Sequence, residues 1–134
     1  MAAKPENTFI GAVHKHVPPE VYRMKTNNPY VAGIPDCYYS GNKGELWVEY
    51  KFIPKIPLRA NVQANLSALQ LHWLRGRASE GRNVAVVIGG PEGGLVLHNP
   101  KLWGIEIAPA EFRDFLVSRA SVADWIALQT TRAI

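Results

Sequence analysis

Residues 84–88 read Val-Ala-Val-Val-Ile, an apolar run without a polar residue. A strand with one face in water alternates apolar and polar side chains, so an unbroken run indicates a strand covered on both faces. Covering both faces of a sheet takes further elements on each side of it, and these are usually helices. The run therefore predicts an α/β fold with a central mixed β-sheet flanked by helices.

A β-hairpin is expected ahead of this run. Residues 37–39 and 46–52 are rich in aromatic and apolar side chains, and the residues between them have the composition of a turn. If the turn centres on the Asn42–Lys43 bond, Asp36 faces Glu49 across the hairpin. Side chains opposed in this way have Cβ atoms about 5 Å apart, and like charges there are destabilising.

A bound cation would relieve this repulsion. Two carboxylates at that distance suit Mg²⁺ or Mn²⁺, which take oxygen ligands. Alternation along the second strand puts Glu49 and Lys51 on one face, so the amine lies beside the carboxylate. Metal, water and an amine are the parts needed to hydrolyse a phosphodiester. The alternative is an ordinary salt-bridged hairpin, in which Glu49 pairs with Lys51 and Asp36 only follows a turn.

The same residues carry a resemblance to a known family. Gly33–Asp36 and Trp47–Lys51, a Pro-Asp followed by Glu-x-Lys, resemble the PD-(D/E)XK nuclease signature. Extended by Leu66–Gln70, Trp73-Leu74 and Gly81, they resemble its VRR-NUC branch, which is similar to archaeal and phage Holliday-junction-resolving enzymes. The match covers roughly residues 4 to 98, although the letters VRR do not occur in the chain. The resemblance implies a restriction-endonuclease-like core and a Mg²⁺- or Mn²⁺-dependent DNA endonuclease of the stand-alone phage type.

The resemblance also implies roles for individual residues. Asp36 and Glu49 would hold the metal with help from the Tyr50 carbonyl, and Lys51 would orient or activate the attacking water. Glu6, on an N-terminal helix, would assist by binding a second ion or through water. The alternative for Glu6 is a carboxylate that compensates the helix dipole. Products are expected to carry 5′-phosphate and 3′-hydroxyl ends.

Gln70 has two expected uses. Ser67 at an N-cap with Gln70 three residues later forms a capping box. The family resemblance instead points Gln70 at the active site, and we expect the two uses to compete for one side chain. The helix that starts here should bury an apolar stripe and end at Gly81. The stripe consists of Leu66, Leu69, Trp73 and Leu74.

The remaining elements follow from local signals. We expect a helix from Pro5 that ends before Pro18-Pro19, a short strand at 21–24, and a hairpin turn at 89–94. Further expected elements are a strand at 103–107, a helix at 109–117 and a helix capped by Ser121. We expect one nuclease domain over 1–134, with its core at about 4–98 and a helical tail at about 108–132. Apolar residues of that tail would cover the sheet or form a dimer contact.

The charge balance permits a polyanionic partner. The chain has a formal net charge of +4, and basic residues gather near the expected site. Candidate DNA contacts are Lys25, Tyr30, Lys55, Arg59 and Arg75. The alternatives are a plain connector around Lys25 and Tyr30, a stiff proline-rich linker around Lys55 and Arg59, and an ordinary solvated surface.

The function expected from these observations is cleavage of duplex or branched DNA, with Holliday junctions as the first choice. The alternatives are a sequence-specific homing or nicking endonuclease, and a non-catalytic DNA-binding module. One site cuts one strand, so a C2 homodimer is expected. We expect no membrane span, because no apolar run approaches the roughly 20 residues needed to cross a bilayer. We expect no nucleotide cofactor, because the glycine-rich turn lacks a phosphate-loop ending. A lone Cys37 fits a reducing cytoplasm, that of the host cell if the protein is phage-encoded.

Overall fold

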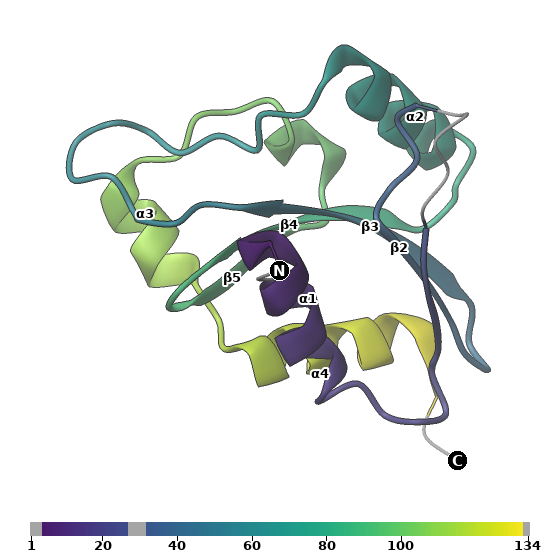
Figure 1. Cartoon of the computed structure of the whole chain (residues 1–134). Helices are drawn as coiled ribbons and strands as arrows, with labels where there is room; N and C mark the ends of the chain where they lie inside the picture. The colour runs from purple at the N-terminus through teal and green to yellow at the C-terminus, as the bar shows by residue number, and fades with distance from the viewer. Residues whose placement is uncertain (1–3, 27–31, 133–134) are drawn as a thin grey trace.

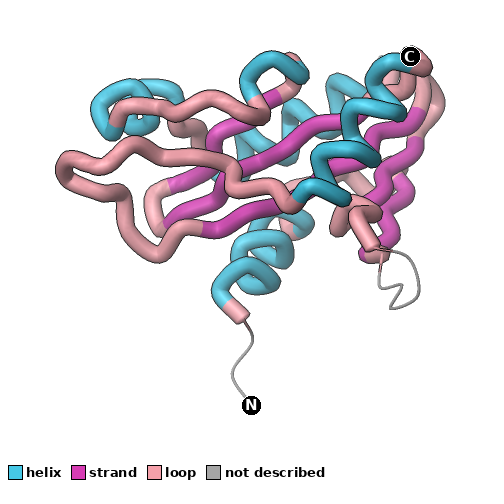
Figure 2. Tube along the Cα trace, turned by 90° about the horizontal axis from the view of Figure 1, so that it is seen from above, coloured by secondary structure: helices cyan, strands magenta, loops and turns pink. Residues whose placement is uncertain are grey.

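The computed structural model describes residues 4–26 and 32–132. It has a five-stranded sheet with helices on both faces (Figures 1 and 2). The strands are β1 (Tyr22–Lys25), β2 (Cys37–Ser40), β3 (Glu45–Phe52), β4 (Val84–Gly90) and β5 (Gly93–Leu97). The helices are α1 (Pro5–His14), α2 (Ala68–Ser79), α3 (Pro109–Phe115) and α4 (Arg119–Thr130), with a 3-10 turn at Pro100–Leu102. The predicted α/β class is confirmed.

The sheet is mixed. Its strand order is β1-β2-β3-β4-β5, and only the β3–β4 pair is parallel. A parallel pair needs a crossover, and the chain between these strands supplies it with α2. All seven residues of β4 are buried, so the central strand inferred from the apolar run is confirmed.

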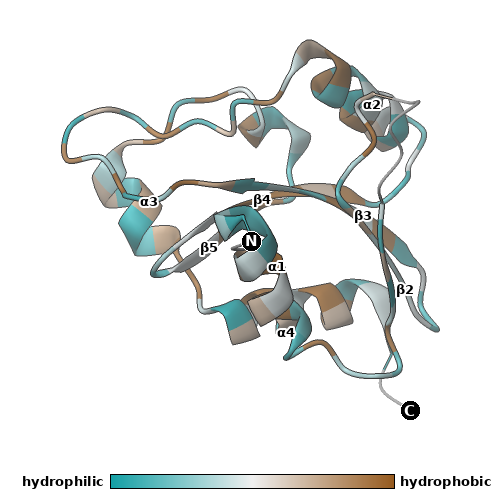
Figure 3. Cartoon of the chain, in the orientation of Figure 1, coloured by the Kyte–Doolittle hydropathy of each residue, from teal (hydrophilic) through white to brown (hydrophobic). Residues whose placement is uncertain are grey.

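Two apolar cores lie on the two faces of the sheet. Helices α1 and α4 cover one face, where Val13, Tyr50 and Ile126 are fully buried together (Figure 1). The other core joins β4 to α2 and α3 through Leu74 and Phe112. Hydrophobic residues follow the strands and the inner helix faces, whereas the first turn of α1 is hydrophilic (Figure 3). That polar turn is the part of α1 that reaches the functional site.

The hairpin register is the one expected from its turn. Cys37 pairs with Val48 and Tyr38 with Trp47. Asp36 directly precedes the first paired residue, in a bend, and its carboxylate accepts a hydrogen bond from the Tyr50 amide. Asp36 therefore lies beside the residue that follows Glu49 on β3.

Helix α1 ends at His14, before Pro18-Pro19 as expected, and Val17 is buried in the turn that follows, where its amide donates to the His14 carbonyl. The strand expected after β5 was wrong. Residues 103–107 are not a strand, since the buried Trp103 ring donates to the Leu97 carbonyl and anchors the chain in an irregular segment. Only Ile107 pairs there, in an isolated bridge to Val62.

The C-terminal helix begins earlier than expected. Ser118, not Ser121, is the N-cap of α4, and its side chain accepts a hydrogen bond from the Ser121 amide. With this start, Val122 and Ile126 face the core that they share with α1. The tail therefore covers the sheet, one of the two roles expected for it. Leu69, which was expected in the buried stripe of α2, is 57% exposed, and Phe115 at the end of α3 is 66% exposed.

Gly33 fixes the approach of Asp36 to α2. Its φ is +90°, and a Cβ atom there would lie 2.6 Å from the Leu69 carbonyl oxygen. We expect Gly33→Ala to lower the free energy of unfolding by about 2 kcal/mol or more, because strain and a backbone clash add. Gly44→Ala is the matched control, with no atom within 4 Å of the added Cβ. Equal stability of the two variants in urea unfolding would contradict this account.

Candidate functional site

Asp36 and Glu49 meet on the face of the sheet that α2 covers. Asp36 stands just before β2, and its Oδ2 accepts a hydrogen bond from the Tyr50 amide at 2.9 Å. Glu49, in the middle of β3, is only 3% exposed. Glu49 accepts a hydrogen bond from Gln70 of α2, so it points to the α2 side. Two acids distant in the chain are thus held against neighbouring strands at one point.

The carboxylates repel one another. Burial is the main cause that raises the pKa of Glu49 from 4.5 to about 8. The charge of Asp36 comes next, while Lys51 acts in the opposite direction and Glu6 adds to the rise. Burial and then the Asp36 charge also raise the pKa of Glu6, at the start of α1. A positive charge bound among the three acids would reduce the electrostatic repulsion between their carboxylates.

Lys51 and Gln70 complete the cluster. The Lys51 ammonium donates to Gln70 Oε1 at 2.9 Å and lies 3.6 Å from Glu49 Oε2. Gln70 in turn donates from Nε2 to Glu49 Oε2 at 3.0 Å. The amide of Gln70 therefore bridges the amine and the buried carboxylate.

Gln70 also caps its helix, and the expected competition between its two uses was wrong. The side-chain oxygen Oε1 of Gln70 accepts a hydrogen bond from the Ser67 backbone amide at 2.9 Å. The backbone amide of Gln70 donates to Ser67 Oγ at 3.1 Å. An amide oxygen has two lone pairs, and the NH₂ group remains free to donate. One side chain therefore serves the capping box, Lys51 and Glu49 at once.

This shared role predicts unequal costs for two substitutions. Ser67→Ala removes only the cap and should lower the free energy of unfolding by about 1 kcal/mol. Gln70→Leu should cost about 1–3 kcal/mol more, because Lys51 and the buried Glu49 lose a partner as well. Urea unfolding of both variants measures the difference, and equal losses would mean that the Gln70 bridge contributes nothing to stability.

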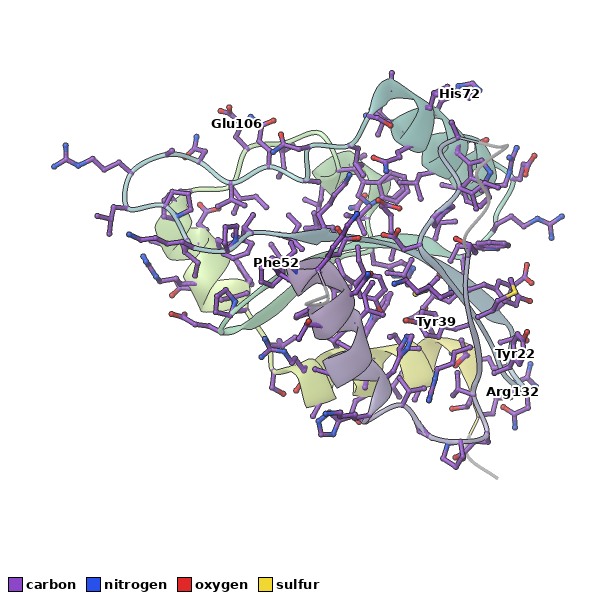
Figure 4. The ribbon with its side chains drawn as sticks, in the orientation of Figure 1. Tyr22, Tyr39, Phe52, His72, Glu106 and Arg132 are labelled. Carbon is purple, nitrogen blue, oxygen red and sulfur yellow. The ribbon has the colours of Figure 1, made fainter. Side chains whose placement is uncertain are left out.

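Tyr50 lies between the site and the core. Its ring is fully buried, and its hydroxyl lies 2.6 Å from that of Tyr39, which is 2.8 Å from His14 Nε2. Tyr39 lies between the sheet and α4 (Figure 4). Because the amide of Tyr50 points to Asp36, its carbonyl faces the same edge of β3. A main-chain oxygen is thereby directed to the side on which Asp36 lies.

The donor set fits a magnesium-like ion. Within residues 4–26 and 32–132, no three His, Cys, Asp or Glu side chains form a group that could hold a metal ion. Mg²⁺ needs no such cage, since it binds through one or two carboxylates and takes its other ligands from water and phosphate. Asp36, Glu49 and the Tyr50 carbonyl match that requirement.

A polar hollow of about 580 Å³ adjoins the acids. Its lining consists of Lys4, Glu6, Asn7, Lys25, Thr26 and Asp36. Lys25 donates to Asn7 Oδ1, and the Thr26 amide donates to the Asp36 carbonyl. Sequence reasoning missed Lys4, Asn7 and Thr26. The available signal for Thr26 was its place just after a strand that pairs with the hairpin.

The candidate DNA contacts are dispersed. Of the four candidates that the structure describes, Lys25 alone lines the hollow beside the acids. Lys55 and Arg59 are exposed on the segment after β3, which extends beside α3 and away from the start of α2 (Figure 1). Arg75 is exposed on α2. Tyr30 lies outside the described residues.

In the part of the chain that the structure describes, no helix has the length and apolar character of a membrane span.

No protein-family model matches the chain, and no curated protein matches it. Among solved structures, the chain is similar to Hjc, a Holliday junction resolvase from the archaeal hyperthermophile Archaeoglobus fulgidus. The identity is 15%, the TM-score is 0.54, and the alignment covers 90% of this chain and 97% of that one. The chain therefore has the restriction-endonuclease-like fold of this resolvase.

Proposed function

We propose that the protein is a divalent-metal-dependent endonuclease that hydrolyses phosphodiester bonds in branched DNA. The observation that carries this proposal is the cluster of Asp36, Glu49, Lys51 and Gln70 on one face of the sheet. A structural ion pair alone needs neither a carboxylate of raised pKa nor an amide bridge to its amine. The fold adds support, because a Holliday junction resolvase shares it.

Each residue has a role in this proposal. Asp36, Glu49 and the Tyr50 carbonyl would hold Mg²⁺ or Mn²⁺, which would neutralise phosphate charge and acidify a bound water. Lys51 would orient the attacking water and stabilise negative charge on the phosphorus oxygens in the transition state. Gln70 keeps the Lys51 amine in place by its 2.9 Å hydrogen bond. Glu6 would act through water or on a second ion.

The DNA would extend from the acids over the polar hollow. Lys25, which lines the hollow, would contact the phosphate next to the scissile one. The exposed Lys55, Arg59 and Arg75 would contact more distant backbone, and Tyr30 is kept as a candidate contact. These contacts position the DNA and carry no sequence information of their own.

The finer assignments rest on separate observations. The choice of branched DNA rests on the likeness to the resolvase, and the VRR-NUC branch rests on the residue strings around Asp36, Glu49 and Gln70. A homodimer follows from the need for two sites to cut two strands. Sedimentation velocity with and without junction DNA measures this assembly, and a monomer bound to a cut junction would contradict it.

Cleavage of end-labelled four-way junctions and matched linear duplexes tests the proposal. We expect cutting with Mg²⁺ or Mn²⁺, none with EDTA, and cuts at a fixed distance from the branch, with 5′-phosphate and 3′-hydroxyl ends. Cuts at a position set by sequence would instead identify a homing or nicking enzyme. Tight binding without cutting in any metal would identify a non-catalytic module and end the proposal.

A further inference from the structure

A row of aromatic side chains lies directly beside the acids. Tyr38 is two residues from Asp36 along the chain, and Trp47 is two residues from Glu49. Tyr38 and Trp47 are paired across the hairpin. Residues two apart in a strand share a face and lie about 6.6 Å apart. The aromatic pair therefore occupies the next position along the same face as the acids.

The row is continuous from the sheet edge to α2. The ring centroids are 6.3 Å apart for Tyr22 and Tyr38, 4.7 Å for Tyr38 and Trp47, and 5.3 Å for Trp47 and Trp73. The Arg77 guanidinium lies 5.6 Å from the Trp73 ring. We refer to Tyr22, Tyr38, Trp47 and Trp73 as the aromatic row. It spans β1, β2, β3 and α2.

The β1 end of this row faces solvent, whereas Trp47 and Trp73 pack partly against the core under α2. Tyr22 is 58% exposed, Met24 on the same face is 42% exposed, and the other three rings are half-buried. All four residues of β1 are exposed, and Tyr22 lies at the outer side of the sheet (Figure 4). The packed helices α1 and α4 cover the opposite face. Ring pairs of this kind stabilise a sheet, but an aromatic surface left in water beside a reactive site indicates a ligand.

The chemistry of the row fits nucleic acid bases. Bases stack on aromatic side chains whatever their sequence. The Arg77 guanidinium at the α2 end is paired with the Glu80 carboxylate at 2.6 Å, so stacking on the rings, and not the charge of Arg77, carries the expected interaction. Bases inside a duplex are already stacked on their neighbours, so only unpaired or unstacked bases gain from such a surface. Tyr38 donates to Glu45 at 2.7 Å. That carboxylate disfavours phosphate beyond Tyr38, which limits the row to one or two bases.

We infer that the aromatic row is a stacking surface for one or two unpaired DNA bases next to the phosphate at Asp36 and Glu49. The inference rests on the proposed function for the kind of polymer. It adds what the site selects, which is DNA opened at a branch, gap or flap over continuous duplex.

Binding in Ca²⁺ tests the inference without cutting. The probes are a fluorescent duplex and the same duplex with a short unpaired segment, compared by anisotropy. Tyr38→Leu and Tyr22→Ala should each weaken binding of the opened DNA about tenfold, with duplex binding unchanged. Tyr38→Phe keeps the ring and should bind as the wild type does. Phe115→Ala removes another exposed aromatic side chain, on α3, and should have no effect.

The outcomes separate this inference from the proposed function. Equal losses on both probes, or no loss in folded variants with unchanged melting temperature, would overturn the stacking surface even if the protein cuts DNA. A selective loss supports it even if no metal supports cutting. As a second measurement, 5-iododeoxyuridine in the unpaired segment should photocrosslink to Tyr22, Tyr38 or Trp47. Crosslinks confined to the segment after β3 would overturn it.

Discussion

Lys51→Ala lowers the single-turnover rate of junction cleavage about a hundred- to thousandfold, with DNA binding nearly unchanged. The Lys51 amine is 3.6 Å from Glu49 Oε2 and 2.9 Å from Gln70 Oε1, so it is held in place before substrate arrives. A preorganised charge aimed at the transition state is worth this much when it is removed. Ground-state affinity changes little, because one phosphate contact among several is lost. Quenched-flow cleavage of labelled junctions under saturating enzyme measures the rate.

The matched control is Lys15→Ala. Lys15 is exposed and follows the last turn of α1, at the opposite end of the helix from Glu6. The Lys15→Ala substitution removes the same charge from the chain without touching the site, so the cleavage rate of this variant should equal that of the wild type. A Lys51→Ala protein that cuts within tenfold of the wild-type rate would show that Lys51 serves the fold and not the reaction.

The second large effect is a loss of stability of the metal-free protein as the pH rises. The pKa of Glu49 is about 8 in the folded chain and near 4.5 when exposed. The unfolded chain therefore releases this proton first, and the folded state loses stability from about pH 4.5 up to about pH 8. At about 1.4 kcal/mol for each pH unit between the two values, the loss amounts to a few kcal/mol. Melting in EDTA across this range measures it.

Glu49→Gln isolates the carboxylate. The glutamine has no proton to lose, so the variant should be the more stable of the two proteins at pH 8 and above. Burial lowers the pKa of His14 to about 4, which removes stability as the pH falls below about 6.5. His14 contributes equally to both proteins, so the difference between their melting curves reports Glu49 together with the acids that interact with it.

Calcium should reverse the trend in the wild type. An ion that binds the ionised acids stabilises the folded state more at pH 8 than at pH 6, because it no longer competes with the proton. Glu49→Gln should lose this gain. A wild-type melting temperature that Ca²⁺ and Mg²⁺ leave unchanged at pH 8 would contradict the metal site, whatever the cleavage assay shows.

Local chemistry made some of the fold and site predictable. The Asn42–Lys43 turn sets the register of β2 and β3, which pairs Cys37 with Val48 and so brings Asp36, one residue before Cys37, close to Glu49, one residue after Val48. The apolar run of β4 requires cover on both faces. Ser67 and Gln70 form a capping box because their spacing is a property of one helical turn. Each of these depends on neighbours in the chain, so spacing alone suffices.

Other features depend on contacts between distant segments. Gln70 bridges Lys51 and Glu49 only because α2 packs with its start over β3. The segment that begins at Trp103 has a strand-like sequence but does not form a strand, because the Trp103 ring donates a hydrogen bond to the buried Leu97 carbonyl. Position 33 requires glycine for two reasons: its φ is positive, and the Leu69 carbonyl lies where a Cβ atom would be. The spacing of residues in the sequence does not predict contacts of this kind.

The sequence by itself predicted that two acids and an amine lie on one face of a hairpin, because strand alternation combined with a turn centred on Asn42–Lys43 brings them together. Only the tertiary structure decided what surrounds them: the burial that raises the pKa of Glu49, the amide of Gln70 and the hollow below α1. Those properties come from desolvation and close packing between elements far apart in the chain, and they exist only when all the layers are assembled.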